Sequence, residues 1–348
     1  MEKVYLSDLR KMVDLCRAMP NTKMLATAKV NAMVLLNMSY EKVMVDRNFS
    51  EHPYTYTRDL VRHINENLQA WNNIQFAEMA GAVSVAGAHE QMEEMHQDLF
   101  QTLWTKFSPE DYNDRIQRYV YRLELNGLGK EFAGGRCIDF GCGHGNFAHA
   151  LLRKGAKYVL GIDYGEGSVK FAERARDNLG VSRNDLEFRL STVYDVSEPD
   201  GSFDFAIQNG VFHHLDDEDR AYKEVHRVLK PGGYFWVYTD GEGAINHDLW
   251  DASREALSDI PFSFIVEHLE ALNLSTGKRY HLGDGLNAVY RHTSWDEITS
   301  RLARLGFGEF RRITGGFDTD FDHDVIAADK YGREKFGEGD LRLICRKL

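Results

Sequence analysis

Apolar and polar positions follow two different periods along this chain. In the first third, apolar residues recur every three or four positions, which is the period of a helix with one apolar face. One such series consists of Met92, Met95, Leu99, Leu103 and Phe107. The period predicts helices over 7–18, 22–46 and 57–71, and the residues SPED at 108–111 supply a serine cap, a proline and first-turn acids for another. The N-terminal third is therefore predicted to be an all-helical unit.

After Gly134 and Gly135 the period changes. Short apolar runs (CIDF, YVLGID, LEFRL, FDFAIQ and YFWVYT) alternate with helical segments of about ten to fifteen residues. This alternation is typical of parallel βαβ units, in which helices cover both faces of the sheet. Two later runs, EFRRIT after LARLGF and the terminal DLRLICRKL, predict a closing pair of strands. The pattern indicates a helical domain over 1–108 and an α/β domain over 109–348, with a helical insertion at 241–293 that we expect to form a lid.

Composition narrows the classes of function. The chain has 348 residues, which favours two domains, and a net charge of −12 with no long basic cluster, which argues against a nucleic-acid partner. Four scattered cysteines without a CxxC pair argue against a disulfide framework and favour a reducing, cytoplasmic location. We find no signal peptide and no apolar run of membrane-spanning length, and so expect no membrane partner.

A glycine-rich turn follows the first predicted strand. Asp139 is followed by Gly141, Gly143 and Gly145, and glycines at such a place let the backbone approach a ligand at the N-terminus of the next helix. A dinucleotide fingerprint needs GxGxxG, whereas this chain has GxGxG with Asn146 at the expected third position. The spacing therefore disfavours NAD.

At this turn the chain resembles the class I S-adenosylmethionine-dependent methyltransferases, in particular the branch that acts on small molecules. The resemblance covers about residues 109–240 and the last strand pair. It rests on IDFGCGHGNF, on LGID ending at Asp163, on DGSFDFAIQNGVFHHL, on EVHRVLKPGGYFWV and on the GF at 306–307. It implies a Rossmann-like, doubly wound, mostly parallel seven-stranded sheet that binds S-adenosylmethionine. A carboxylate at Asp163, one βα unit after the turn, can accept hydrogen bonds from a ribose diol.

The resemblance also implies a set of cofactor-binding residues. The expected set is Asp139, Gly141, Gly143, Gly145, Asp163, Tyr164, Thr192, Val193, Gln208 and Asn209. Many relatives carry an acid after the third strand, but this chain has LSTVYD there, with Asp195 displaced by several residues. Thr192, the backbone of Val193 and the ring of Tyr194 are the expected contacts to the adenine.

Four residues are candidates for catalysis: His213, His214, Tyr290 and His292. The two histidines follow the fourth strand, where they either act on the acceptor or only order the turn. Tyr290 and His292 belong to NAVYRHTSW, in which Arg291 either pairs with an anionic substrate or bridges lid and core at the surface. Tyr238 and Asp240 end the fifth strand with no role assigned.

An acidic run, GGFDTDFDHDV at 315–325, lacks the sixth-position glycine and the twelfth-position glutamate of a calcium loop. We interpret it as a solvated or partner-facing hairpin rather than a metal site or a site for a cationic substrate, and we expect no metal elsewhere.

The sequence thus predicts an S-adenosylmethionine-dependent enzyme that methylates a small molecule by in-line displacement. The chain can position the acceptor for attack, and a general base is needed only if the acceptor arrives protonated. Two alternatives remain open: a non-catalytic S-adenosylmethionine-binding protein, and a methyltransferase that modifies proteins. The resemblance further suggests a homodimer formed through the N-terminal helices.

Overall fold

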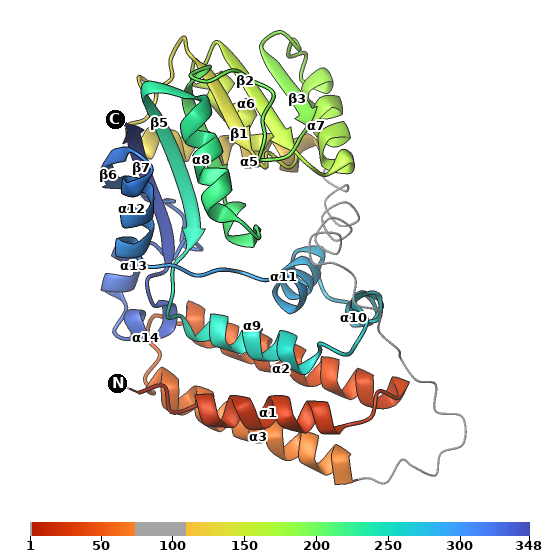
Figure 1. Cartoon of the computed structure of the whole chain (residues 1–348). Helices are drawn as coiled ribbons and strands as arrows, with labels where there is room; N and C mark the ends of the chain where they lie inside the picture. The colour runs from red at the N-terminus through yellow and green to blue at the C-terminus, as the bar shows by residue number, and fades with distance from the viewer. Residues whose placement is uncertain (1, 74–108) are drawn as a thin grey trace. The chain divides into compact units, whose positions relative to one another are not determined.

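A computed structural model describes residues 2–73 and 109–348. The helical series between Met92 and Phe107 falls outside these residues. The described chain divides into two compact units (Figure 1). One contains residues 2–73, 243–289 and 326–337, and the other contains 109–242, 290–325 and 338–348. The predicted insertion thus belongs, over most of its length, to the same unit as the N-terminal helices.

The first unit is helical. Its helices are α1 (Leu6–Ala18), α2 (Lys23–Val45), α3 (Pro53–Asn73), α9 (Ile245–Ala256), α10 (Phe262–Ala271), α11 (Thr276–Asn287) and α14 (Gly332–Phe336). α2 begins where the Thr22 side chain accepts a hydrogen bond from the backbone of Leu25, as an N-cap does. Val30, Met33 and Leu36 of α2 are buried in one core with Ile245 and Leu249 of α9. Within residues 2–73 and 109–348, no helix has both the length and the apolar character of a membrane span.

The second unit contains a seven-stranded sheet in the order β3-β2-β1-β4-β5-β7-β6. Its strands are β1 (Arg136–Phe140), β2 (Tyr158–Asp163), β3 (Leu186–Leu190), β4 (Phe203–Asn209), β5 (Leu229–Asp240), β6 (Phe307–Arg312) and β7 (Asp340–Lys347). The first five are parallel, and β7 runs antiparallel to both β5 and β6. The doubly wound, mostly parallel sheet predicted from the apolar runs is confirmed.

Helices cover both faces of this sheet (Figure 1). One core joins the sheet to α5 (Pro109–Leu125), α6 (Asn146–Arg153) and α7 (Glu166–Asn178), and the other joins it to α8 (Glu218–Val228) and α12 (Trp295–Arg304). Successive β1 residues alternate between the two cores, with Cys137 in the first and Ile138 and Phe140 in the second. Strands buried on both faces explain why the sequence shows continuous apolar runs.

The chain leaves and re-enters this unit at one place beyond the end of β5. The Gly241 amide donates to the carbonyl of Gly339 (2.7 Å), the Glu242 amide donates to that of Thr293 (2.9 Å), and the Glu338 amide donates to that of Glu242 (2.8 Å). Glu242, which precedes the segment 243–289, is therefore hydrogen-bonded to Thr293 shortly after that segment and to Glu338, which follows the segment 326–337. Because β5 is parallel to β1 and β7 is antiparallel, this place lies at the same edge of the sheet as the glycine turn.

Candidate functional site

The turn after β1 adopts backbone conformations that favour glycine. Gly141, Gly143 and Gly145 have φ angles of +70°, +52° and +80°. A Cβ at 141 would lie 2.6 Å from Val211 Cγ1, and a Cβ at 145 would lie 2.3 Å from Phe188 Cζ, so both glycines are required by packing inside the unit. At Gly143 a Cβ would meet no atom of residues 2–73 and 109–348 within 4 Å. Of the three, Gly143 therefore borders open space.

The carboxylate of Asp163, at the end of β2, is joined to this turn. It accepts hydrogen bonds of 2.8 Å from the backbone N–H groups of Gly143 and Gly165. Burial raises the pKa of Asp163, and these N–H groups oppose that effect. An ionised carboxylate has about four acceptor positions, so it can still accept a hydrogen bond from a ligand hydroxyl.

Asp139, at the end of β1, is the second acid of the turn. Its side chain is buried, and its Oδ2 atom has no hydrogen-bond partner among the described residues. Burial, reinforced by the negative charge of Asp163, raises the pKa of Asp139 to about 7. A buried acceptor without a partner beside a second carboxylate fits a ligand that brings a positive charge and N–H donors.

Helix α5 covers the turn, which the sequence analysis did not foresee. The Tyr112 hydroxyl donates to the carbonyl of His144 (2.6 Å), and the Tyr119 ring stacks on Phe147 with centroids 4.5 Å apart. The Tyr119 hydroxyl also lies 3.5 Å from Asn209 Nδ2. Tyr112 and Tyr119 are seven residues apart, which places them on one face of a helix, and this spacing could have predicted that the face packs on the turn.

The other predicted cofactor residues lie near this edge in different settings. Tyr164 is exposed, and Thr192 Oγ1 accepts from the backbone of Tyr194 (3.3 Å). Val193 is buried in the core. The fully buried Gln208 side chain donates to the carbonyl of Tyr238 and accepts from the amides that follow β4, so it orders the next loop. Trp236 Nε1 donates to Asn209 Oδ1 (3.3 Å).

All four predicted catalytic side chains come together at the same edge. His213 and His214, in the short helix η2 (Phe212–His214), have their Nε2 atoms 2.9 Å apart. The Tyr290 ring centroid lies 4.4 Å from that of His214 and 5.2 Å from that of His213. The His292 ring lies parallel to Tyr290 with centroids 6.4 Å apart. The cluster is adjacent to the glycine turn because Val211, which packs on Gly141, is two residues before His213.

Backbone hydrogen bonds fix the segment that carries Tyr290 and His292. The Arg291 amide donates to the carbonyl of His213 (2.9 Å), and the Thr293 amide donates to that of Asp240 (3.2 Å). The Arg291 side chain is 43% exposed and lies 3.7 Å from Asp216, so it forms a surface ion pair within the unit. Because both partners belong to the sheet unit, this pair is not the predicted bridge between lid and core.

The prediction of a solvated hairpin at 315–325 is wrong for two of its acids. Asp320 and Asp322 are buried. Asp320 accepts hydrogen bonds from Arg122 (2.8 Å) and Arg342 (3.0 Å), and Asp322 accepts from Arg342 (2.7 Å). Arg342 also lies 3.0 Å from Asp340. Two arginines from α5 and β7 therefore bind these carboxylates, which explains how acids can be buried in this run.

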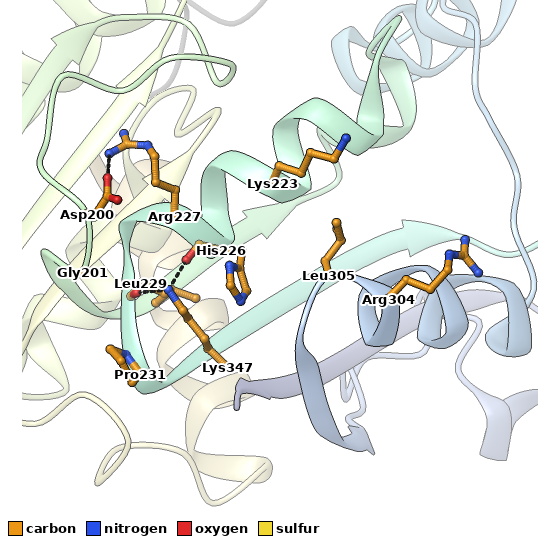
Figure 2. A pocket seen from close by; sticks show the side chains of 10 residues that line it. All are labelled: Asp200, Gly201, Lys223, His226, Arg227, Leu229, Pro231, Arg304, Leu305 and Lys347. Atoms are coloured by element: carbon orange, nitrogen blue, oxygen red, sulfur yellow. Dashed lines mark hydrogen bonds and ion pairs between the residues drawn. The ribbon is translucent and has the colours of Figure 1, made fainter.

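A cavity of about 730 Å³ lies elsewhere in this unit, at the edge where β5 begins (Figure 2). It is lined by Asp200, Gly201, Lys223, His226, Arg227, Leu229, Pro231, Arg304, Leu305 and Lys347. Two of its cations have local roles: Lys347 Nζ donates to the carbonyls of His226, in the last turn of α8, and of Leu229, and Arg227 pairs with Asp200. Cations are favoured at helix C-termini. The cavity is at the opposite edge from the glycine turn, and we do not assign the active site to it.

Parts of this chain are similar to known methyltransferases. Residues 138–237 match the family model described as a methyltransferase domain. The chain is 30% identical over 184 residues to a fatty-acid O-methyltransferase of Mycolicibacterium smegmatis (52% of this chain, 63% of that protein). It is 36% identical over 107 residues to a sterol 24-C-methyltransferase of Aspergillus fumigatus (30% and 28%). The chain thus spans less than two thirds of the length of either relative.

Among solved structures, the fold is similar to that of the Burkholderia thailandensis 1,6-didemethyltoxoflavin-N1-methyltransferase. The TM-score is 0.42 at 15% identity, over 78% of this chain and 98% of that one. A likeness of this size identifies neither a substrate nor a reaction.

Proposed function

Since this chain belongs to the class I S-adenosylmethionine-dependent methyltransferases, we propose that it transfers a methyl group from S-adenosylmethionine to a small-molecule acceptor. The observation that carries the proposal is the turn in which Gly143 borders open space and donates its N–H to Asp163, whose negative charge helps to raise the pKa of the buried Asp139. When bound, the cofactor would supply a methyl group activated by a positively charged sulfur. The residues of the chain would bind it, orient it and exclude water.

Each residue of the turn fits one part of this ligand. Asp163 would accept hydrogen bonds from the ribose hydroxyls, and Asp139, with its unpartnered Oδ2, would face the cationic methionine part. The backbone at Gly143 would let the ligand approach without a side chain in the way. Tyr112 and Tyr119 of α5 would hold the turn from the other side.

The histidine cluster would act on the acceptor. His213 and His214 lie at the edge where ligands of open α/β sheets bind, and His214 is only partly buried. One of these rings would take the proton of an acceptor that arrives protonated, while Tyr290 and His292 would form a wall beside it. The matched relatives are named for O- and C-methylation, and the acceptor atom in this chain is left open.

Calorimetric titration of the purified chain with S-adenosylhomocysteine, with NADH as a control ligand, tests the proposal. We expect saturable binding of S-adenosylhomocysteine alone, weakened in Asp163→Ala by roughly 10- to 150-fold as charge-assisted hydrogen bonds are lost. Asp195→Ala is the matched control, because Asp195 is an exposed acid on the loop after β3. Equal affinities of both variants and the parent chain would refute the assignment of Asp163.

The two alternatives give different results in a second assay with labelled S-adenosylmethionine. A methyltransferase for small molecules transfers label to a member of a panel of phenols, acids, amines and thioethers. Label that appears only in added protein indicates the protein-modifying alternative. Binding without any transfer indicates a non-catalytic protein.

A further inference from the structure

Gln208, near the end of β4, connects that strand to β5 and to residues 210–214, which we call the histidine turn. Its side chain is fully buried. Its Nε2 atom donates to the carbonyl of Tyr238 (2.9 Å), and its Oε1 atom accepts from the amides of Val211 (3.2 Å) and Phe212 (3.3 Å). A backbone carbonyl only accepts and a backbone N–H group only donates, so these partners determine the orientation of the side-chain amide.

The two residues whose amides Gln208 binds also pack on the start of the glycine turn. A Cβ at Gly141 would lie 2.6 Å from Val211 Cγ1. The Phe212 ring meets the ring of Phe140, the last residue of β1, edge to face with centroids 6.0 Å apart. The two histidines follow directly in the chain, so their distance from the glycine turn depends on where these two residues lie.

The glycine turn is held in place without Gln208. The amides of Gly141 and Cys142 donate to the carbonyl of Ile162 on β2 (2.8 and 2.9 Å), and the amide of the next glycine donates to Asp163. Removing the polar group of Gln208 should therefore loosen the histidine turn and leave the cofactor-binding turn as it is.

We propose that Gln208 is a positioning residue for methyl transfer: its amide holds the histidine turn so that His213 and His214 keep a fixed distance from the glycine turn. This inference rests on the proposed function. In that reaction the sulfur–methyl bond breaks with its electron pair left on sulfur, a lone pair of the acceptor forms the new bond to the methyl group, and a proton lost by the acceptor passes to a ring and then to solvent. An error of about 1 Å in such a geometry can slow a reaction about 100-fold. The Arg291 amide holds the carbonyl of His213 on the other side (2.9 Å), so Gln208 supplies the support on the side of β4.

The test compares the parent chain with Gln208→Met and with the control Asn126→Leu. Methionine has nearly the length of glutamine and leaves the two amides of the histidine turn without their side-chain acceptor. Asn126 is a matched control, because its side-chain amide also joins backbone segments of the sheet unit. It donates to the carbonyls of Arg122 and Thr314 (2.8 Å each) and accepts from the amide of Thr314 (3.0 Å), and these residues lie outside the histidine turn.

We expect both variants to melt at a lower temperature than the parent. Only Gln208→Met should lower kcat, by roughly 10- to 100-fold, with the KM for S-adenosylmethionine within about threefold of that of the parent. The amides of Val211 and Phe212 should exchange hydrogen faster in this variant, whereas that of Gly141 should not. A residue that only stabilises the fold would change the melting temperature and leave kcat per folded molecule unchanged.

Gln208→Glu gives a second test, which decides if Gln208→Met does not fold. A protonated carboxyl group can replace the amide, since it has an O–H group for Tyr238 and a second oxygen for the two amides, whereas an ionised carboxylate can only accept. Burial raises the pKa of a carboxyl group. The ratio of kcat in this variant to kcat in the parent should therefore be higher at about pH 5.5 than at about pH 8.5.

Three results would overturn the proposal: an unchanged kcat in Gln208→Met, an equal loss of kcat in Asn126→Leu, or a low ratio for Gln208→Glu that does not change with pH. A parent chain that neither binds S-adenosylhomocysteine nor transfers label contradicts the proposed function instead. Hydrogen exchange at Val211 and Phe212 still decides in that case whether Gln208 holds the histidine turn.

Discussion

Asparagine in place of Asp139 should stabilise the protein and weaken its ligand binding. Asp139 is buried beside Asp163 with one oxygen unpartnered, and its pKa is raised to about 7 from 3.8. The folded chain therefore holds the Asp139 proton more tightly than the unfolded chain does. The stability from this preference is complete below about pH 3.8 and is lost as the pH rises through about 7. An asparagine side chain does not titrate, so its contribution to the stability of the folded chain is the same at every pH.

The size of the effect follows from the same two pKa values. One pKa unit corresponds to about 1.4 kcal/mol. The unfolding free energy of Asp139→Asn should therefore gain about 2 kcal/mol over that of the parent chain between about pH 5.5 and about pH 7, and the difference should stay level above that. A change of this size moves the melting temperature of a unit of this length by roughly 4 to 8 °C. We expect the affinity for S-adenosylhomocysteine to fall by roughly 10- to 100-fold in the same variant, since a charged acceptor is lost.

Calorimetric unfolding of the parent and Asp139→Asn at about pH 5.5 and about pH 8 measures the difference. Asp195→Asn controls for the removal of one negative charge, because Asp195 is exposed. The reasoning is refuted if the advantage of Asp139→Asn is the same at both pH values, or if Asp195→Asn shows the same growth.

Three further predictions concern the same unit. Gly145→Ala should lower the melting temperature more than Gly143→Ala, since only at 145 would the new Cβ overlap a ring. The overlap should cost about 1–3 kcal/mol of unfolding free energy beyond the backbone strain that both variants share. Equal losses of melting temperature would contradict this prediction. Arg342→Met should lower the free energy of unfolding in urea by about 3–5 kcal/mol, because it leaves buried carboxylates without a positive charge. Arg346 is half-exposed, so Arg346→Met should lower it by under about 1 kcal/mol. His213→Ala should slow methyl transfer with unchanged affinity for S-adenosylhomocysteine; full turnover would make the histidine structural.

Local patterns were enough to predict most of the sheet. Each of the seven predicted strands is present, because apolar runs with glycine turns are properties of a few consecutive residues. β5 begins at Leu229, five residues before the predicted YFWVYT, because Leu229 already pairs with Phe203 of β4; the turn at Gly232, with a φ of +79°, lies within the strand as an irregularity. Asp139, Gly143 and Asp163 were predicted as a group because one βα unit separates two neighbouring strand ends.

Long-range pairing was not predicted. The bond from Arg122 to Asp320 joins residues 198 positions apart, and no periodicity in 315–325 indicates that an arginine of α5 will cover these acids. Likewise, Ile245 and Leu249 share a core with the N-terminal helices although the sequence places them in an insertion of the α/β domain. Burial of a charge depends on its partner, and the partner is known only from the fold.

The hydrogen bonds around Gly241 determine where the sequence of this protein can change in the course of evolution. Because Glu242 is hydrogen-bonded to Thr293 and to Glu338, the sheet unit holds together the two ends of the segment 243–289 and the end of the segment 326–337. The entropy cost of closing a loop rises only slowly with its length, so the segment 243–289 can be lengthened, shortened or exchanged at small cost to the sheet. New residues can thus be inserted next to the edge of the sheet that carries the histidine cluster without any change in the glycine turn.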